Sequence, residues 1–471
     1  MRKETILNAA PSSASSLAAA LLAAALAAAC SAPPSATSPQ ASVAAAPQTS
    51  REAPPQAAPC PADVPAGARC LRGRDSAGAP YLIVVPERWN QVLVVHAHGG
   101  PALGEPKTER ADEDIKRWAI TVRAGYAWAG SVFRQGGVAV RSAAEDTERV
   151  RRIFVEHVAV PRRTLLHGQS WGASVAAKAA EMYARAERGA SPYDGVLLSS
   201  GVLGGGTRSY DFRLDLRVIY QYLCGNHPRA DEPQYPLWQG LPADSKLTRN
   251  ELAARVNQCL GVRQPAAKRT PEQARKLDTI VKLIRIPESA VLPHLNWATW
   301  HFQDIALHRT GGGNVFGNDG VRYQGSADDA AINQGVLRYR ADPQAVARFA
   351  YDTDPSGQIP VPVLTVHGIG DATAFIELDS AFRQTMERAG TADHLVQTFT
   401  RDASHSYLSD PVYPALFEAL LRWIDAGTKP TPAGIAQRCE QLQAQFGPGC
   451  RFDVGYRPAP LETRVAPRGG R

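Results

Sequence analysis

The stretch GQSWG at residues 168–172 decides the fold, because of what stands on either side of it. Residues 164–167, TLLH, are a short apolar run typical of a buried strand. Residues 173–187, ASVAAKAAEMYARAE, favour a helix. The flanking glycines permit a tight turn between strand and helix, and such a turn lifts a serine hydroxyl above the edge of a sheet. Ser170 is therefore a candidate nucleophile.

Strand-like and helical patterns alternate on both sides of this turn. Apolar, β-rich runs precede it, a helical pattern with one apolar face lies at residues 143–158, and similar runs return near the C-terminus. Such alternation predicts an α/β fold with a mostly parallel central sheet and helices on both faces. The expected strands are 81–86, 91–98, 127–133, 164–168, 193–201, 361–368 and 394–400.

The alternation stops between residues 202 and 354. Only amphipathic helical patterns occur there, at 247–260 and 271–286, followed by an aromatic-rich run at 294–302. We expect one large helical cap inserted between two parts of a single sheet. The predicted segments are hydrolase core 60–201, cap 202–354, second part of the core 355–427 and a C-terminal extension 428–471.

Two later strand ends supply the groups that a serine nucleophile requires. A serine hydroxyl is weakly nucleophilic at neutral pH and needs a base, which an acid in turn orients. Asp371 follows the run 361–368, and His405 follows the run 394–400. Serine, aspartate and histidine on successive strand ends predict a catalytic triad of Ser170, Asp371 and His405. Asp402 is the alternative acid.

The loop HGGP at residues 98–101 closes the strand that runs over 91–98. Its glycines let the backbone approach a substrate carbonyl, whereas Pro101 has no N–H to donate. The amides of Gly99 or Gly100, together with the amide of Trp171, are the candidate oxyanion donors.

These residues together resemble the α/β-hydrolase superfamily, over about residues 81–201 and 361–427. HGGP combined with GxSWG is similar to the proline iminopeptidase group of serine peptidases. That group usually has glycine where Ala102 and Gln169 stand here. Its cap carries acidic residues that bind a free substrate amine, and the acidic residues available in this cap are Asp231, Glu232, Asp328 and Asp329.

The predicted function is a secreted serine hydrolase that cleaves carboxylic esters through an acyl-enzyme. Two alternatives stay open: a serine aminopeptidase of proline iminopeptidase type, and a catalytically silent binding module. No cofactor or metal is expected, because glycines 311–313 lack the Gly-Lys-Ser/Thr ending of a phosphate loop and no CxxC or His-rich spacing occurs. The formal charge of +7 comes from scattered arginines, which argues against a nucleic-acid partner.

The N-terminus predicts export. Positive residues precede an uninterrupted apolar run at 17–29, so residues 1–29 are expected to be a signal peptide. Cys30 resembles the acylated cysteine of bacterial lipoproteins, which would attach the protein to the outer membrane. The alternative is cleavage after an Ala-x-Ala site and a periplasmic or secreted product. Residues 30–59 have the Ala, Pro and Ser-rich composition of a disordered tether.

The remaining six cysteines are an even number, as expected for disulfides in an exported protein. Six cysteines allow 15 connectivities. Pairing of neighbours in the sequence is favoured because it closes short loops. The expected pairs are Cys60 with Cys70, Cys224 with Cys259, and Cys439 with Cys450.

Overall fold

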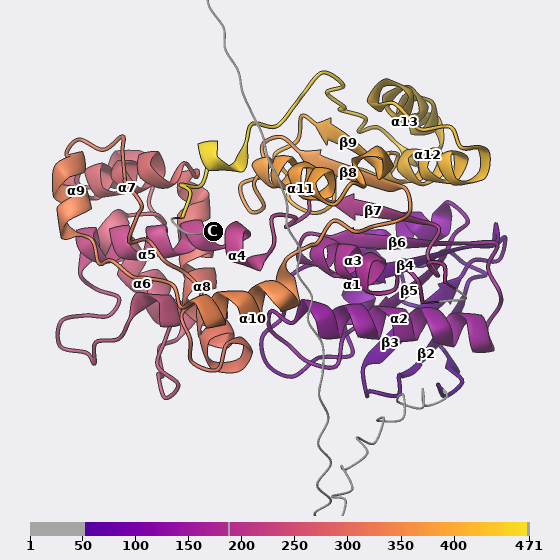
Figure 1. Cartoon of the computed structure of the whole chain (residues 1–471), viewed down its shortest axis with the longest axis horizontal. Coiled ribbons are helices and arrows are strands. Elements are labelled where there is room, and N and C mark those ends of the chain that lie inside the picture. The colour runs from indigo at the N-terminus through magenta and orange to yellow at the C-terminus, as the bar shows by residue number, and fades with distance from the viewer. Residues whose placement is uncertain (1–51, 187–188, 469–471) are drawn as a thin grey trace, which may run out of the picture. The chain divides into compact units, whose positions relative to one another are not determined.

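The computed structural model of the 471-residue chain describes residues 52–186 and 189–468 (Figure 1). The expected signal peptide, Cys30 and most of the expected tether lie outside these residues. Within the two described ranges, no helix is both long enough and apolar enough to cross a membrane.

A nine-stranded sheet lies at the centre of the fold, in the order β1-β2-β3-β5-β4-β6-β7-β8-β9. The strands from β5 to β9 in this order run parallel to one another, and β1, β2 and β3 add antiparallel pairs at one edge. The strands are β1 (Gln56–Ala58), β2 (Arg69–Arg74), β3 (Pro80–Val85), β4 (Val92–Ala97), β5 (Ala127–Ser131), β6 (Arg163–Gln169), β7 (Gly195–Ser199), β8 (Val363–Gly368) and β9 (Leu395–Thr400).

Helices cover both faces of this sheet (Figure 1). Successive residues of β4 point to opposite faces, so Val95 joins one buried cluster and Val94 another. Helices α2 (Val140–His157), α3 (Trp171–Met182) and α11 (Glu377–Arg388) contribute to the first cluster. Helices α1 (Arg110–Arg123), α12 (Val412–Ala426) and α13 (Pro432–Phe446) contribute to the second. The predicted α/β fold, with a mostly parallel central sheet and helices on both faces, is thereby confirmed.

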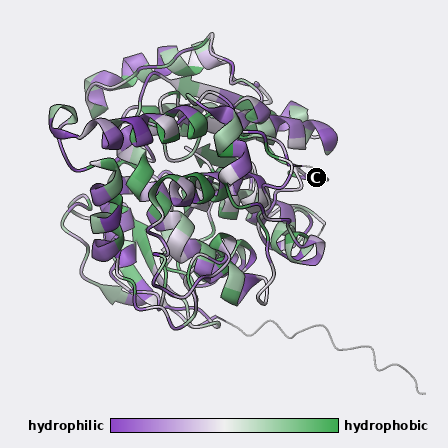
Figure 2. Cartoon of the chain, turned by 90° about the vertical axis from the view of Figure 1, so that its left-hand side faces the viewer, coloured by the Kyte–Doolittle hydropathy of each residue, from purple (hydrophilic) through white to green (hydrophobic). Residues whose placement is uncertain are grey.

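The segment between β7 and β8 contains no strand among its residues, all of which are described. It forms a third buried cluster that also includes Leu378 of α11 and Phe375, just before that helix. In Figure 2 this side faces the viewer, and its helices are hydrophilic in some parts and hydrophobic in others. Its helices are α4 (Gly206–Ser209), α5 (Asp211–Cys224), α6 (Arg249–Leu260), α7 (Pro271–Ile284), α8 (Glu288–Asp304), α9 (Asp329–Gly335) and α10 (Pro343–Thr353).

The sequence pattern missed the first strand. Residues 52–59 were expected to belong to the tether, but Gln56–Ala58 form β1 and pair with β2. Glu52 is buried, and its carboxylate accepts hydrogen bonds from the backbone and the hydroxyl of Ser76. The ordered chain therefore starts before Cys60, because the backbone of β1 finds partners at the edge of the sheet that its composition does not reveal.

The described part of the chain contains three disulfides, each between cysteines that are neighbours in the sequence. Two of them close short loops, one next to β2 and one at the end of α13, and the third joins α5 to α6. The pairs are Cys60–Cys70, Cys224–Cys259 and Cys439–Cys450.

Candidate active site

Ser170 occupies the turn between β6 and α3 with φ 58° and ψ −123°. Few non-glycine residues adopt positive φ, and such strain persists only where the surroundings enforce it. The flanking glycines show the constraint, because a Cβ on Gly168 would lie 2.2 Å from the carbonyl oxygen of Gly172. A Cβ on Gly172 would lie 2.1 Å from the carbonyl oxygen of Ala97. Only glycine fits at either position.

His405 joins Ser170 to Asp371. Its Nε2 lies 2.7 Å from Ser170 Oγ, so the hydroxyl can donate its proton to this nitrogen. Its Nδ1 lies 2.6 Å from Asp371 Oδ2, which accepts the hydrogen bond from the other side of the ring. The structure thus brings together three residues that are far apart in the sequence. This is the geometry that proton transfer from a serine nucleophile requires.

Asp371 is held as an ionised acceptor. Its Oδ1 accepts hydrogen bonds from the backbone N–H groups of Thr373 and Ala374. Burial opposes ionisation, but hydrogen bonds from His367 and His405 outweigh it, and the pKa of Asp371 falls well below its ordinary value.

Asp402, the alternative acid, lies elsewhere. Its carboxylate Oδ1 pairs with Arg451 Nη1 at 3.1 Å, and its backbone carbonyl accepts from the N–H of Gly370. Asp402 thus helps to fix the loop that carries Asp371 rather than contacting the ring of His405.

A second histidine extends this arrangement into the core. His367 Nε2 lies 3.2 Å from Asp371 Oδ2, and His367 Nδ1 lies 2.6 Å from Asp379 Oδ2. Burial disfavours a charged ring, yet the two carboxylates outweigh it and raise the pKa of His367 to about 10. The sequence analysis missed His367 and Asp379. The only signal was the position of His367 at the end of β8, four residues before Asp371.

Gln169 stands where the resembling peptidases have glycine, and it has a defined contact here. Its Nε2 donates a hydrogen bond to the hydroxyl of Ser406, next to His405. Its amide also packs against Gly99, where a Cβ would lie 2.4 Å from Gln169 Oε1. Gln169 therefore links the turn at Ser170 to the histidine loop and to the HGGP loop.

The candidate oxyanion donors lie at two places beside Ser170. Trp171 is the first residue of α3, where backbone N–H groups lack acceptors within the helix and the helix dipole is positive. Gly100 has φ 71°, a conformation that suits glycine. Within 52–186 and 189–468, the amides of Gly99, Gly100 and Trp171 donate to no protein acceptor.

Other groups fix the HGGP loop from outside. Arg110 Nη2 donates to the carbonyl of Gly99 at 2.6 Å, and His301 Nε2 lies 3.0 Å from the carbonyl of Pro101. His301 comes from α8, so the inserted helices touch the loop directly. A cavity of about 270 Å³ opens beside the loop; among the residues that line it are His98, Pro101, Phe133, Gly136 and Trp171.

The acidic residues considered as amine ligands do not reach the triad. Glu232 pairs with Arg255, and Asp328 caps α9. Asp329 accepts hydrogen bonds from the backbone of Gly325 and Ser326, and Asp231 is exposed. Within the described ranges, no group of three or more histidine, cysteine or acidic side chains is placed to hold a metal ion.

No family model matches this chain, and no curated protein matches it either. Its structure is similar to solved α/β enzymes at low identity. Feruloyl esterase B from Aspergillus oryzae is 13% identical, with a TM-score of 0.44 over 80% of this chain and 88% of that one. The rice cell wall degrading esterase LipA from Xanthomonas oryzae is 14% identical, with a TM-score of 0.36 over 80% and 90%.

A hormone-sensitive lipase from a metagenome library is 12% identical, with a TM-score of 0.37 over 81% of this chain and 87% of that one. Similarity at these values says nothing about the substrate of this chain.

Proposed function

We propose that this chain is a serine hydrolase that cleaves carboxylic esters through an acyl-enzyme. The observation that carries the proposal is the continuous hydrogen-bonded series from Ser170 Oγ through His405 to Asp371. A serine on a strained strand-to-helix turn, a base within reach and a buried acid are the parts that nucleophilic acyl transfer needs.

The reaction would proceed in two halves. Ser170 Oγ attacks the ester carbonyl while His405 Nε2 takes the hydroxyl proton, and Asp371 stabilises the imidazolium that forms. The amides of Gly99 or Gly100 and Trp171 would donate to the oxyanion, where one donor contributes about 3 kcal/mol to transition-state stabilisation. His405 then gives the proton to the leaving alcohol. Water, activated by the same ring, releases the acid and restores Ser170.

An ester substrate is favoured over a peptide with a free N-terminus. The acidic residues of the inserted segment have other roles. Glu232 pairs with Arg255, Asp328 caps a helix, Asp329 accepts hydrogen bonds from a turn, and Asp231 is exposed to solvent. The aminopeptidase alternative predicts strong turnover of proline or alanine p-nitroanilides with little turnover of p-nitrophenyl esters. That result would replace the ester proposal.

The test of catalysis is covalent labelling. A fluorophosphonate probe should label the folded chain, and Ser170→Ala should abolish both labelling and ester turnover. Loss of the nucleophile typically lowers kcat by about 10⁶-fold. Ser174→Ala, four residues further along α3, is a matched control that should keep the label. Equal labelling of wild type and Ser170→Ala would favour the catalytically silent alternative.

Export and lipid attachment at Cys30 are part of the same proposal. Three disulfides support an oxidising compartment such as the periplasm. In a bacterial host, we expect palmitate to label the full-length protein and the membrane fraction to retain it. Cys30→Ser should lose both. Release of unlabelled wild type into the periplasm or medium would instead support cleavage after an Ala-x-Ala site.

A further inference from the structure

One buried cation of the inserted helices has no anionic partner. Arg213 on α5 is only 4% exposed, and its guanidinium carbon lies 4.5 Å from the ring centres of Phe212 and Trp297. Among the residues that the structure describes, its one hydrogen bond runs from Nη1 to the carbonyl of Ser209 at 3.2 Å, and its Nε is buried without an acceptor. Among the described residues, no carboxylate lies within ion-pair distance of it.

Several other arginines with little exposed side-chain surface pair with carboxylates. Arg468 binds Asp215, Arg255 binds Glu232, and Arg309 binds Asp304. Arg217, one turn further along α5, pairs with no carboxylate but donates to three acceptors, Thr299, Tyr235 and the carbonyl of Gly240. Arg213 differs because aromatic rings enclose it while most of its donors stay unused.

An unpaired buried guanidinium destabilises the fold. Transfer of a charge out of water is costly unless a counter-charge and hydrogen bonds replace the solvent. Burial lowers the pKa of Arg213 to about 9, so the side chain is still a cation at neutral pH. Cation–π contacts offset only part of such a cost. A bound anion would offset the rest.

Side-chain contacts connect Arg213 to the HGGP loop and to the loop that carries Asp371. The first connection runs through Trp297. Trp297, under the guanidinium, stacks on His301 at 4.6 Å, and His301 binds the carbonyl of Pro101 in the HGGP loop. His301 Nδ1 is also buried without a partner.

The second connection runs through Phe212, which packs edge-on against His294 at 4.9 Å. His294 Nε2 lies 2.8 Å from the carbonyl of Ala372, the residue after Asp371. Arg213 and Asp371 both lie close enough to His294 to influence its pKa. Arg213 therefore lies on the triad side of the inserted helices.

We infer that Arg213 binds a carboxylate of the substrate, so that Ser170 acts preferentially on esters that carry a free carboxylate. This inference rests on the proposed function. A guanidinium presents a planar set of donors that matches a carboxylate, and the aromatic walls hold its plane in place. The neighbouring histidines do not supply the positive charge, because burial lowers the pKa of His294 to about 3 and that of His301 to about 4.

The test uses substrates that differ only in charge. Mono-4-nitrophenyl adipate is compared with 4-nitrophenyl hexanoate, which places the carboxylate on the acyl side. The 4-carboxyphenyl and 4-carbamoylphenyl esters of hexanoic acid place it on the leaving group. In one of the two pairs we expect wild type to prefer the anionic ester by about 10- to 100-fold in kcat/KM, the range for hydrogen bonds to a charged group.

Arg213→Met should reduce this preference to about twofold or less, and Arg213→Lys should restore part of it. Arg217→Met, on the same helix, is the matched control and should keep the wild-type ratio. Removal of an unpaired buried charge should leave the unfolding midpoint of Arg213→Met unchanged or higher. If that variant does not fold, the wild-type ratios alone decide.

Each outcome separates the two proposals. Turnover of neutral esters by wild type without preference in either pair would overturn the role of Arg213 and leave the serine hydrolase standing. A preference that Arg213→Met retains would also overturn it. Absence of any ester turnover, with labelling independent of Ser170, would overturn both.

Discussion

His367 extends the candidate site into the core behind Asp371. It bridges Asp371 and Asp379, and its raised pKa keeps the ring protonated at neutral pH. An imidazolium behind Asp371 favours the ionised carboxylate, which is the form that stabilises a protonated His405. His367 and Asp379 are therefore positioning residues, since neither touches Ser170.

Asp379→Asn tests this role. Loss of the carboxylate removes the strongest charge that favours protonation of His367, so the pKa of His367 should fall toward or below its ordinary value. We expect kcat to fall about tenfold with little change in KM, and the decline of kcat at alkaline pH should begin at lower pH than in wild type. The measurement is kcat and KM from pH 6 to 11.

Stability gives an independent readout. A histidine whose pKa is raised in the folded state stabilises fully below its unfolded pKa of about 6.5, and this contribution is lost as pH rises through about 10. The free energy of unfolding of Asp379→Asn should lack this pH dependence. Asp379→Glu, which keeps the charge, should resemble wild type. Identical pH profiles for wild type and Asp379→Asn would exclude the positioning role.

The site residues that could be predicted from the sequence are those whose immediate neighbours in the chain form a recognisable pattern. The glycines on either side of Ser170 predict the strand-to-helix turn. Asp371 and His405 each follow an apolar run that predicts a strand. Asp379 lies within an amphipathic helix, where a carboxylate is most often on the solvated face. Its burial arises only when α11 packs on the sheet. Arg213 was missed for the same reason, because exposure and partners are tertiary properties.

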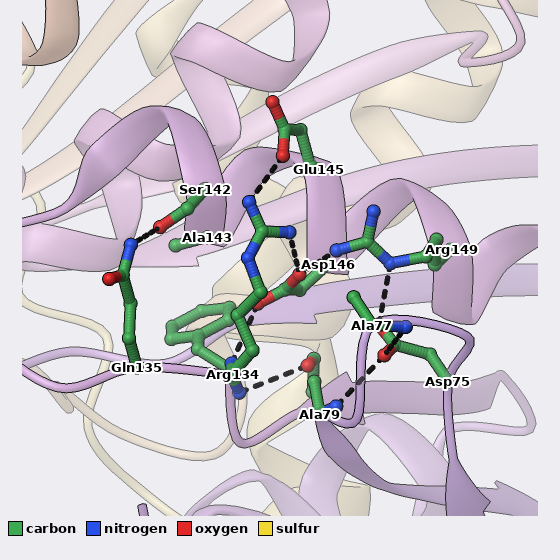
Figure 3. Close-up of polar contacts among 12 residues, drawn as sticks. Asp75, Ala77, Ala79, Arg134, Gln135, Ser142, Ala143, Glu145, Asp146 and Arg149 are labelled. Atoms are coloured by element: carbon green, nitrogen blue, oxygen red, sulfur yellow. Dashed lines mark hydrogen bonds and ion pairs between the residues drawn. The ribbon is translucent and has the colours of Figure 1, made fainter. Parts of the chain in front are cut away.

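At the scale of elements, a charged network fixes the loop that follows β5. Figure 3 shows Arg134 reaching Glu145 and Asp146 of α2, and Arg149 reaching Asp146 and Asp75. Asp146 also accepts from the backbone N–H of Arg134 at 2.7 Å.

This loop borders the candidate site. Phe133 stacks on His98 with ring centres 4.3 Å apart, and the N–H of Gly137 donates to the carbonyl of Ala102 at 2.6 Å. Asp304 of α8 accepts from the N–H of Val138 at 2.9 Å. The network on α2 thus holds a loop that the HGGP loop and the inserted helices both contact.

Two substitutions compare a buried ion pair of Arg134 with an exposed one. Asp146→Asn removes the charge of the buried partner, and Glu145→Gln removes that of the exposed partner. Asp146 has no exposed side-chain surface, whereas the Glu145 side chain is 37% exposed. Loss of the Asp146 charge leaves Arg134 and Arg149 without their shared partner and should lower the free energy of unfolding by about 3 kcal/mol. Glu145→Gln should cost less than about 1 kcal/mol. Urea unfolding at pH 7 measures both, and equal costs would contradict the assigned roles.

The elements of the parallel sheet were the most predictable part of the chain. Central strands such as β4 and β8 are fully buried and therefore read as continuous apolar runs. The edge strand β1 carries the sequence Gln-Ala-Ala and is largely exposed, so nothing in its pattern distinguishes it from the tether. Of the inserted helices, α6 and α7 match the helical patterns predicted at 247–260 and 271–286, whereas α8 was seen only as an aromatic-rich run. The contacts of α8 with the HGGP and Asp371 loops depend on packing.

On the scale of the whole chain, the C-terminal extension joins the sheet to the inserted helices. Phe452 pairs with Thr400 at the end of β9, and Arg464 bonds with Glu377 at the start of α11. Two residues before Arg464, Glu462 pairs with Arg208. In Figure 1 this segment, in yellow, runs from the region of α13 and β9 to the vicinity of α4 and α5. The described residues of the extension make such contacts as far as Arg468.

Arg468 makes the last of these contacts and allows the function of the extension to be measured. Its Nη2 lies 2.6 Å from Asp215 Oδ2 on α5, and both side chains are only 6% exposed. Asp215 also accepts from the hydroxyl of Tyr323. Removal of one partner of a buried pair leaves the other charge uncompensated, so Arg468→Met should lower the free energy of unfolding by about 3–5 kcal/mol.

Arg457→Met is the control, since Arg457 is exposed and, within 52–186 and 189–468, its side chain bonds only to carbonyls of Val454 and Tyr456. It should cost less than about 0.5 kcal/mol. If the loss in Arg468→Met comes from the unpaired carboxylate, Asp215→Asn in the same chain should recover part of it, and the double-mutant cycle gives the coupling energy. Equal unfolding free energies for the two arginine variants would show that the extension does not hold the inserted helices to the sheet.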